Sequence, residues 1–227
     1  MASSDAVKNE INWHDDILPR ATQKALKFLS GQSWLKDSKW YLAGGTALAL
    51  HEGHRSSVDL DFFSPEKEFD LEFFLGHFPK DYWVADVVRK GTIYGRLHNA
   101  KVSFIAYPFF VSKAKSDFYG AVRILKPQDI AVMKIIAVSQ RGKKRDFVDL
   151  YWYVKNREPL PDILHRLPEQ YPTVAHDYHH ILKSLMYFND AEQDPMPELF
   201  FNVTWPEIKK YFQKEVPRIT KEFLGLS

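Results

Sequence analysis

Two groups of residues in the first third of the chain have the types and spacing needed to hold a metal ion and a polyphosphate. Asp59 and Asp61 are two positions apart, so on a strand both carboxylates would lie on the same face. Carboxylate oxygens are the ligands that Mg²⁺ prefers, and substrate phosphates usually complete its coordination shell. The pair therefore predicts a site for Mg²⁺ or Mn²⁺.

The second group is Gly44-Gly45-Thr46. A glycine pair lets the backbone approach a phosphate with no side chain in the way. We expect Thr46 to cap a helix whose free N–H groups and positive dipole end favour an anion, and the threonine hydroxyl adds a donor. Either motif alone is common in turns and strand edges, but together they form one compact unit. An unpaired charge in the otherwise apolar segment 58–63 would also be costly.

Hydrophobic periodicity predicts the elements that position these residues. Residues 40–43 and 58–63 read as strands on either side of a helix that Gly53 ends. Further strands are expected at 83–88, 92–97 and 101–107, with a hairpin at 98–100, and further helices at 15–29, after Asp70, from Pro127, after the loop 141–144, and at 163–167, 174–188 and 205–224. We therefore predict an α+β fold with a small mixed sheet and flanking helices in residues 1–125, and a helical lobe in residues 126–227.

Composition narrows the class of protein. The chain has 227 residues, of which 45% are hydrophobic and 26% charged, which is typical of a globular protein and argues against disorder. A net charge of +2 creates no global field for nucleic-acid binding. The lack of cysteine excludes disulfides and thiolate chemistry. Residues 1–12 lack the apolar stretch of a secretory signal, and no run approaches the roughly 20 residues that cross a bilayer, so we expect a soluble cytoplasmic protein with no membrane contact.

The unit around the glycines and aspartates resembles the nucleotidyltransferase superfamily that includes DNA polymerase beta. The pattern of that superfamily is Gly-Gly or Gly-Ser, a spacer of about ten residues, and Asp-hydrophobic-Asp. Segments 44–50 and 53–63 are similar to its AbiEii/AbiGii toxin branch, as are the later segments 129–134 and 144–150. The resemblance covers about residues 40–153.

This resemblance implies the fold and an activity. The protein would transfer a nucleotidyl group from a nucleoside triphosphate to a hydroxyl acceptor, either tRNA or a protein side chain, with a divalent metal as cofactor. It would be the toxin of an abortive-infection or toxin–antitoxin pair, with a cognate antitoxin as partner. The resemblance makes Asp59 and Asp61 metal ligands and catalytic residues; the residues that would contact the nucleotide are Gly44, Gly45, Thr46, Arg55 and the catalytic Lys134.

Several later residues have structural alternatives to a role at the site. Lys134 could instead lie on a solvated face of an amphipathic helix. The family pattern includes Asp146 and Asp149, but they could instead cap their helix and pair with Arg141, Lys144 or Arg145. We favour this structural role for Asp149, and the role of Asp146 stays open. The basic run 141–145 is usually a solvated loop, but it could contact the phosphates of a nucleic-acid acceptor.

The sequence departs from the superfamily at one position. Members usually add a third carboxylate from a neighbouring strand, which completes the metal site and can act as a general base. Ser103 stands where that acid is expected, and a serine hydroxyl cannot take a proton at neutral pH. Asp86 could substitute if its strand lies alongside. Otherwise the substrate supplies its own activation, one metal suffices, or the protein is a catalytically degenerate module that binds nucleotide without turnover.

Overall fold

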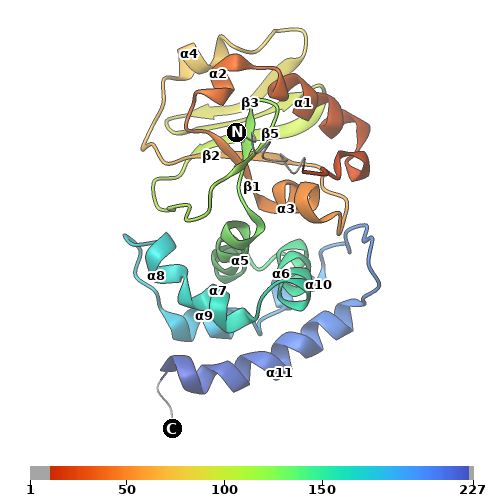
Figure 1. The fold of residues 1–227 in the computed structure, drawn as a ribbon, viewed down its shortest axis with the longest axis vertical. Coiled ribbons are helices and arrows are strands. Elements are labelled where there is room, and N and C mark those ends of the chain that lie inside the picture. The colour runs from red at the N-terminus through yellow and green to blue at the C-terminus, as the bar shows by residue number, and fades with distance from the viewer. Residues whose placement is uncertain (1–10, 225–227) are drawn as a thin grey trace, which may run out of the picture.

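The computed structural model describes residues 11–224 and divides into a half that contains the sheet and a half built of helices (Figure 1). Residues 1–10, which belong to the segment where we expected no secretory signal, lie outside the described residues. Within residues 11–224, no helix is both long enough and apolar enough to span a membrane. The predicted boundary between residues 1–125 and 126–227 falls just before the first helix of the helical half, and it stays a proposal.

One mixed sheet of seven strands forms the centre of the first half, in the order β3-β4-β5-β2-β1-β7-β6. β2 lies between an antiparallel neighbour, β1, and a parallel neighbour, β5. The strands are β1 (Tyr41–Ala43), β2 (Leu60–Ser64), β3 (Trp83–Arg89), β4 (Thr92–Leu97), β5 (Ala100–Ala106), β6 (Asp117–Tyr119) and β7 (Val122–Ile124).

β2 alternates as its sequence predicts, but it starts later than we expected. Leu60 and Phe62 are fully buried, and Phe62 stacks on Phe104 with ring centroids 4.8 Å apart. The strand was predicted over residues 58–63, yet Val58 is half-exposed and precedes it. β1 ends at Ala43, whose partner is Asp61, so residues 58 and 59 have no antiparallel strand to extend along.

The helices of the first half flank this sheet. They are the 3₁₀ turn η1 (Asp15–Ile17), α1 (Arg20–Ser30), α2 (Ser33–Lys36), α3 (Gly44–Glu52) and α4 (Leu71–Leu75). The single helix predicted over residues 15–29 is divided by Pro19, because Leu18 before it adopts an extended backbone and a proline disfavours helical geometry in the preceding residue. Asp70 caps α4 as expected, accepting a hydrogen bond from the Phe73 N–H at 3.0 Å.

α3 connects the sheet to the helical half, and its N-cap lies three residues earlier than predicted. Its N-cap is Ala43 rather than Thr46, and Gly53 ends it with a φ of +61°, as the sequence indicates. The Thr46 hydroxyl lies inside the fold, where it bonds the Asp59 carbonyl and lies 2.8 Å from Ser57 Oγ. This hydroxyl therefore fixes the chain that carries the acids instead of capping the helix.

Of the two hairpins β4–β5 and β6–β7, only the first is predicted by the hydrophobic periodicity of the sequence. β4 and β5 form the predicted hairpin, with His98 and Asn99 both at positive φ in the turn that suits the twist of the strands. The hairpin of β6 and β7 was not predicted. Each of its strands has three residues, which is too short for an alternating pattern to stand out.

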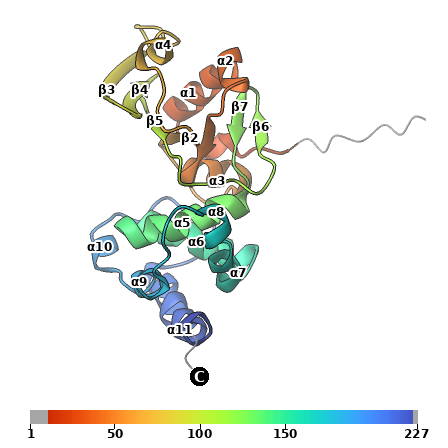
Figure 2. The same ribbon diagram turned by 90° about the vertical axis from the view of Figure 1, so that its left-hand side faces the viewer.

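The second half is helical in its described part (Figure 2). α5 and α6 pack against each other and against α3, while α11 runs along the end furthest from the sheet (Figures 1 and 2). The helix predicted at 174–188 is shorter, because the Asp177 side chain caps a helix that begins after it. The helices are α5 (Pro127–Arg141), α6 (Lys144–Asn156), α7 (Leu160–His165), α8 (Leu167–Gln170), α9 (Tyr178–Ser184), α10 (Asn189–Glu192) and α11 (Trp205–Leu224).

Candidate active site

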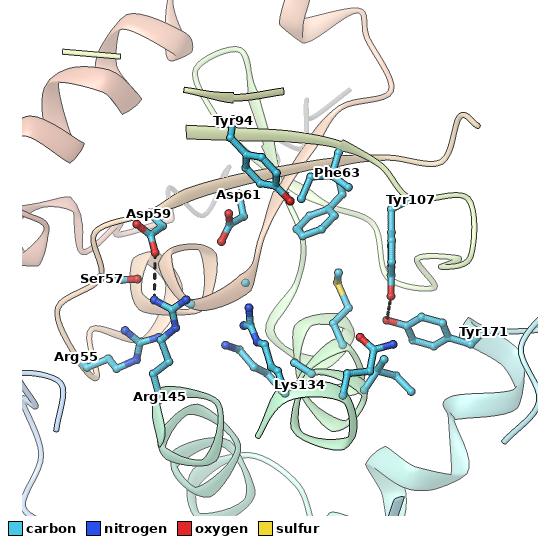
Figure 3. A pocket seen from close by; sticks show the side chains of 18 residues that line it. Arg55, Ser57, Asp59, Asp61, Phe63, Tyr94, Tyr107, Lys134, Arg145 and Tyr171 are labelled. Atoms are coloured by element: carbon cyan, nitrogen blue, oxygen red, sulfur yellow. Dashed lines mark hydrogen bonds and ion pairs between the residues drawn. The ribbon is translucent and has the colours of Figure 1, made fainter. Parts of the chain in front are cut away.

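A cavity of about 280 Å³ lies between the sheet and helices α5 and α6 (Figure 3). Its lining has three parts: acids at the start of β2, cations from both halves of the chain, and aromatic rings from both halves. It brings together most of the residues that the sequence singled out, namely Gly44, Gly45, Arg55, Asp59, Asp61 and Lys134. Segments far apart in the sequence therefore meet at one site.

The two aspartates each use one carboxylate oxygen and keep the other. Asp61 Oδ1 accepts a hydrogen bond of 2.7 Å from Ser103 Oγ, and Asp59 Oδ2 lies 3.1 Å from Arg145 Nη1. Asp59 Oδ1 is buried and has no hydrogen-bond partner among the described residues. Asp61 Oδ2 likewise accepts no hydrogen bond from any described residue. Burial raises the pKa of Asp61, and the nearby Asp59 charge adds to that, while the Ser103 hydroxyl opposes it.

This donor set fits a hard divalent cation. Mg²⁺ is usually held by one or two carboxylates, with substrate phosphates and water completing its shell. Residues 11–224 contain no cluster of three or more side chains that could hold a metal, so the protein would supply two carboxylates and the substrate the rest. A cation beside Asp59 Oδ1 would also satisfy a buried oxygen that the described fold leaves unpaired.

The backbone conformation of the turn and the packing around the cavity require glycine at its two positions. Gly44 has a φ of +73°, which a residue with a side chain rarely adopts, and a Cβ there would lie 3.5 Å from Asp61 Oδ2. A Cβ on Gly45 would lie 2.1 Å from Arg55 Nη2. Gly45 thus leaves room for a guanidinium. The Thr46 hydroxyl already bonds the Asp59 carbonyl, whereas the first N–H groups of α3 have no acceptor within the helix. The predicted contact of Thr46 with a phosphate would therefore use its backbone N–H.

A buried network of charges supports the floor of the site. Asp149, which is fully buried, accepts bonds from His54 Nε2 at 2.8 Å and Arg55 Nη2 at 2.9 Å, and its Oδ2 lies 2.6 Å from Lys134 Nζ. Burial alone would raise the pKa of Asp149, but the Arg55 and Lys134 charges outweigh it and hold that pKa well below its usual value. Burial lowers the pKa of His54, although its bond to Asp149 opposes the change.

Asp146 extends this network toward the cavity. It bonds Lys134 Nζ at 2.8 Å and Arg141 Nε at 2.9 Å, and these two cations keep its pKa below the usual value despite burial. Lys134 is therefore a buried, doubly paired side chain and not the solvated helix face that was the alternative. Both Arg55 and Lys134 are engaged by carboxylates at the cavity wall, and their contacts with a phosphate stay predictions.

Several lining residues were missing from the sequence prediction. The sequence offered Arg141 and Arg145 as part of a basic loop, either solvated or in contact with a nucleic acid, and as pairing partners for Asp146 or Asp149. The structure pairs Arg141 with Asp146, which is one of these alternatives, and Arg145 with Asp59, which was not expected. For Arg145 the available signal was its place next to Asp146 in segment 144–150, which resembles the family. Phe63, Tyr94, Tyr107 and Tyr171 form an aromatic side of the cavity, opposite Arg145 in Figure 3. Phe63 could have been found, because it lies two residues after Asp61 on the same face of β2.

Asp86, the candidate for a substitute third acid, sits at a register shift in the edge strand β3. Two strands separate β3 from β2, and the Asp86 carboxylate lies 3.0 Å from Arg96 Nη2. It nevertheless lines a second cavity of about 210 Å³ together with Asp59, Asp61 and Ser103. The role of Asp86 as the third acid stays a prediction.

Comparison with known proteins decides the family. The family model described as "Nucleotidyl transferase AbiEii toxin, Type IV TA system" matches residues 28–90 and 111–223. The chain belongs to the AbiEii family. The resemblance of residues 40–153 to this toxin branch is thereby confirmed, and the family match extends well into the helical half.

Relatives of this AbiEii-family chain include one curated sequence and two solved structures. An uncharacterised protein of Aquifex aeolicus (strain VF5) is 34% identical over 192 residues, covering 82% of this chain and 88% of that protein. A candidate nucleotidyltransferase from H. pylori superposes with a TM-score of 0.51 at 18% identity, covering 90% of this chain and 96% of its own. MenT4, the nucleotidyltransferase toxin Rv2826c of Mycobacterium tuberculosis H37Rv, gives 0.51 at 13% identity, covering 88% and 84%. These structures confirm the predicted α+β nucleotidyltransferase-like fold.

Proposed function

We propose that this AbiEii-family protein transfers a nucleotidyl group from a nucleoside triphosphate to a hydroxyl acceptor, with Mg²⁺ or Mn²⁺ held by Asp59 and Asp61. The observation that carries the proposal is the pair of carboxylates that meet at one cavity beside the glycine turn, each with an oxygen free of hydrogen bonds within residues 11–224. A bound metal ion would polarise the phosphate and orient the triphosphate there.

The cations of the cavity suit a reaction in which charge develops on phosphate oxygens. The acceptor oxygen forms a bond to the α-phosphorus while the bond to the bridging oxygen breaks, and pyrophosphate leaves. Lys134 and Arg141 are preorganised by the buried Asp146 beside the site, so they stabilise this charge without reorganising. Lys134 has three donors and uses two on Asp146 and Asp149, which leaves one for a phosphate.

Ser103 lacks the basicity to remove the acceptor proton at neutral pH. The proton would pass to a substrate phosphate, so that the substrate supplies its own activation. The nucleoside would lie over the aromatic side of the cavity, where Tyr94 is 38% exposed and next to Phe63 and Tyr107 along the wall. Flat rings of this kind stack on a base without selecting its identity.

A larger cavity of about 660 Å³ adjoins the first and suits the acceptor. The two cavities share Arg55, Ser57, Arg141 and Arg145, and the larger one adds Lys143 and an apolar wall at Val58 and residues 195–197. Basic and apolar groups side by side accommodate the phosphates and bases of a tRNA end, and equally a protein segment that carries a hydroxyl. The type IV toxin family supports a cognate antitoxin as partner, an abortive-infection role and a cytoplasmic location.

One observation favours a second candidate function. Ser103, not a carboxylate, faces Asp61 from β5, and a site with two acids would bind a metal–nucleotide complex with little turnover. Under this alternative the protein is a nucleotide-binding or interaction module on the same scaffold.

The test of the proposed function is transfer of label from each of the four α-³²P nucleoside triphosphates to pools of RNA and protein, with Mg²⁺. We expect labelled product with the wild-type protein and with Asp190→Asn, an exposed aspartate far from the acids in sequence. Asp59→Asn and Asp61→Asn should each reduce the rate by at least roughly 100-fold, and chelation should do the same. Mg²⁺-dependent nucleotide binding without product would favour the alternative, and equal labelling by all four proteins would exclude the proposed enzyme site.

A further inference from the structure

Arg145 reaches from the start of α6 to the Asp59 carboxylate just before β2, and this ion pair joins the two halves of the chain at the cavity (Figure 3). Its Nη1 lies 3.1 Å from Asp59 Oδ2. We propose that Arg145 is a resident counter-cation, which competes with the divalent metal for Asp59 and releases this carboxylate when a triphosphate binds. The inference rests on the proposed function and adds a control of metal binding to it.

Arg145 bonds only one of the two carboxylate oxygens of Asp59. Arg145 satisfies only Asp59 Oδ2, while Asp59 Oδ1 is buried with no hydrogen bond from any described residue. A bidentate arginine would occupy both oxygens, as Arg55 does with Asp149. Asp59 thus binds Arg145 through Oδ2 and has Oδ1 available for a second cation. Two cations on one carboxylate repel each other, so each weakens the binding of the other.

Arg145 is also the cation of this cavity that can leave. Its side chain is 45% exposed and that of Asp59 is 24% exposed, and pairs of this kind contribute little net stability. Arg55 and Lys134, in contrast, are 3% and 5% exposed and paired with fully buried carboxylates. Arg141 forks onto the buried Asp146. Breaking the pairs of Arg55 or Lys134 would strand a buried cation. Arg141 is 49% exposed, but its release would remove two hydrogen bonds from a fully buried carboxylate, whereas the release of Arg145 removes one from a partly exposed carboxylate.

The released guanidinium has a place to go. Arg145 lines both the 280 Å³ cavity with the acids and the adjoining 660 Å³ cavity, so it stands at the junction of the two. A triphosphate in the first cavity offers it several anionic oxygens in place of one. Triphosphate binding would therefore free Asp59 for the metal. By linkage, the metal would strengthen triphosphate binding by the same factor. The metal alone would bind weakly.

The experiment measures Mn²⁺ binding to the purified full chain without nucleotide, from the electron paramagnetic resonance signal of free Mn²⁺. Arg145→Gln should bind Mn²⁺ roughly tenfold more tightly than the wild type, because a unit charge next to the ion is removed. Arg145→Lys keeps the charge and should stay near the wild type. Arg157→Gln is the matched control, since Arg157 pairs with Glu52 and is 54% exposed but lies outside both cavities.

A second measurement tests the coupling. A non-hydrolysable nucleoside triphosphate should tighten Mn²⁺ binding more in the wild type than in Arg145→Gln, and Asp59→Asn should abolish the gain that Arg145→Gln produces. Should Arg145→Gln fold poorly by circular dichroism, Arg145→Met keeps the apolar stem without the charge and should give the same result.

The failures of the two proposals are distinct. If the wild type binds Mn²⁺ through Asp59 but Arg145→Gln binds it equally or more weakly, the competition is excluded and the proposed function stands. If no variant binds Mn²⁺ with or without triphosphate, both the competition and the proposed metal site are excluded.

Discussion

Ser103 Oγ donates a hydrogen bond of 2.7 Å to Asp61 Oδ1, and the two residues are register partners on the parallel strands β5 and β2. Both side chains therefore project from the same face at the same level of the sheet. This is the position where the family resemblance implied a third acid, and the serine instead orients one of the two acids present. An outer partner of this kind fixes a ligand in place and tunes its affinity for metal.

Ser103→Ala is accordingly expected to weaken Mn²⁺ binding roughly 10- to 100-fold, the usual effect of losing such a partner. Isothermal titration at pH 7 measures it. Ser112→Ala is the matched control, because Ser112 Oγ donates an equally short bond, 2.7 Å, to Asp129 Oδ2 away from the acids. An unchanged affinity in Ser103→Ala would mean that the serine does not orient a metal ligand.

Asp149 is the carboxylate on which the buried network depends. Asp149→Asn leaves Arg55 and Lys134 without their shared partner in a site that excludes water. We expect the free energy of unfolding in urea to fall by about 3–5 kcal/mol. Asp86→Asn also removes a carboxylate from an arginine pair, but that pair is exposed, so the loss should be below about 1 kcal/mol. Similar losses of unfolding free energy in both variants would contradict the claim that the buried Asp149 network contributes more to stability than the exposed Asp86 pair.

The same network sets the response of stability to acid. The pKa of Asp149 is lower in the folded protein than in the unfolded chain, where it is about 3.9. Its contribution is therefore complete above about pH 4 and is lost as pH falls through the folded pKa. The lowered pKa of Asp146 acts in the same direction. Urea unfolding between pH 7 and pH 3 should show a steep loss below about pH 4 in the wild type and a shallower one in Asp149→Asn. Parallel curves would show that Asp149 does not carry this dependence.

Gly45 tests the packing around the glycine turn. Its missing side chain leaves room for the Arg55 guanidinium, which cannot retreat without breaking its pair with Asp149. We expect Gly45→Ala to lower the free energy of unfolding by about 1–3 kcal/mol or more. In Gly31→Ala the new Cβ would lie 3.6 Å from the Phe28 carbonyl oxygen, an ordinary contact, and thermal unfolding should change little. A stable Gly45→Ala protein would show that Arg55 is free to move.

Sequence reasoning succeeded where local chemistry dictates structure. Gly53 at positive φ ends α3, Asp70 caps α4, and the turn at residues 98–99 joins two alternating strands. The unit from Gly44 to Asp61 was found because the glycines and acids are close in sequence and belong to adjacent elements. The family resemblance carried the fold assignment further than the periodic pattern alone could.

Features set by tertiary packing were not available from the sequence. Arg55 and Asp149 are 94 positions apart, and nothing local indicates that one is the partner of the other. Arg145 lies in a run of basic residues that usually faces solvent, and its contact with Asp59 depends on how α6 meets the sheet. The start of β2 likewise depends on the length of β1, which has three residues.

The central claim is that Asp59 and Asp61 together hold one divalent cation beside a triphosphate at the Gly44–Gly45 turn. The most direct test is a crystal grown with Mn²⁺ and a non-hydrolysable nucleoside triphosphate, with data collected to give anomalous differences. The account predicts a Mn²⁺ peak within coordination distance of oxygens from both carboxylates and from the triphosphate. A bound triphosphate with the Mn²⁺ peak elsewhere, or with Arg145 still on Asp59 and no metal between the acids, would contradict it.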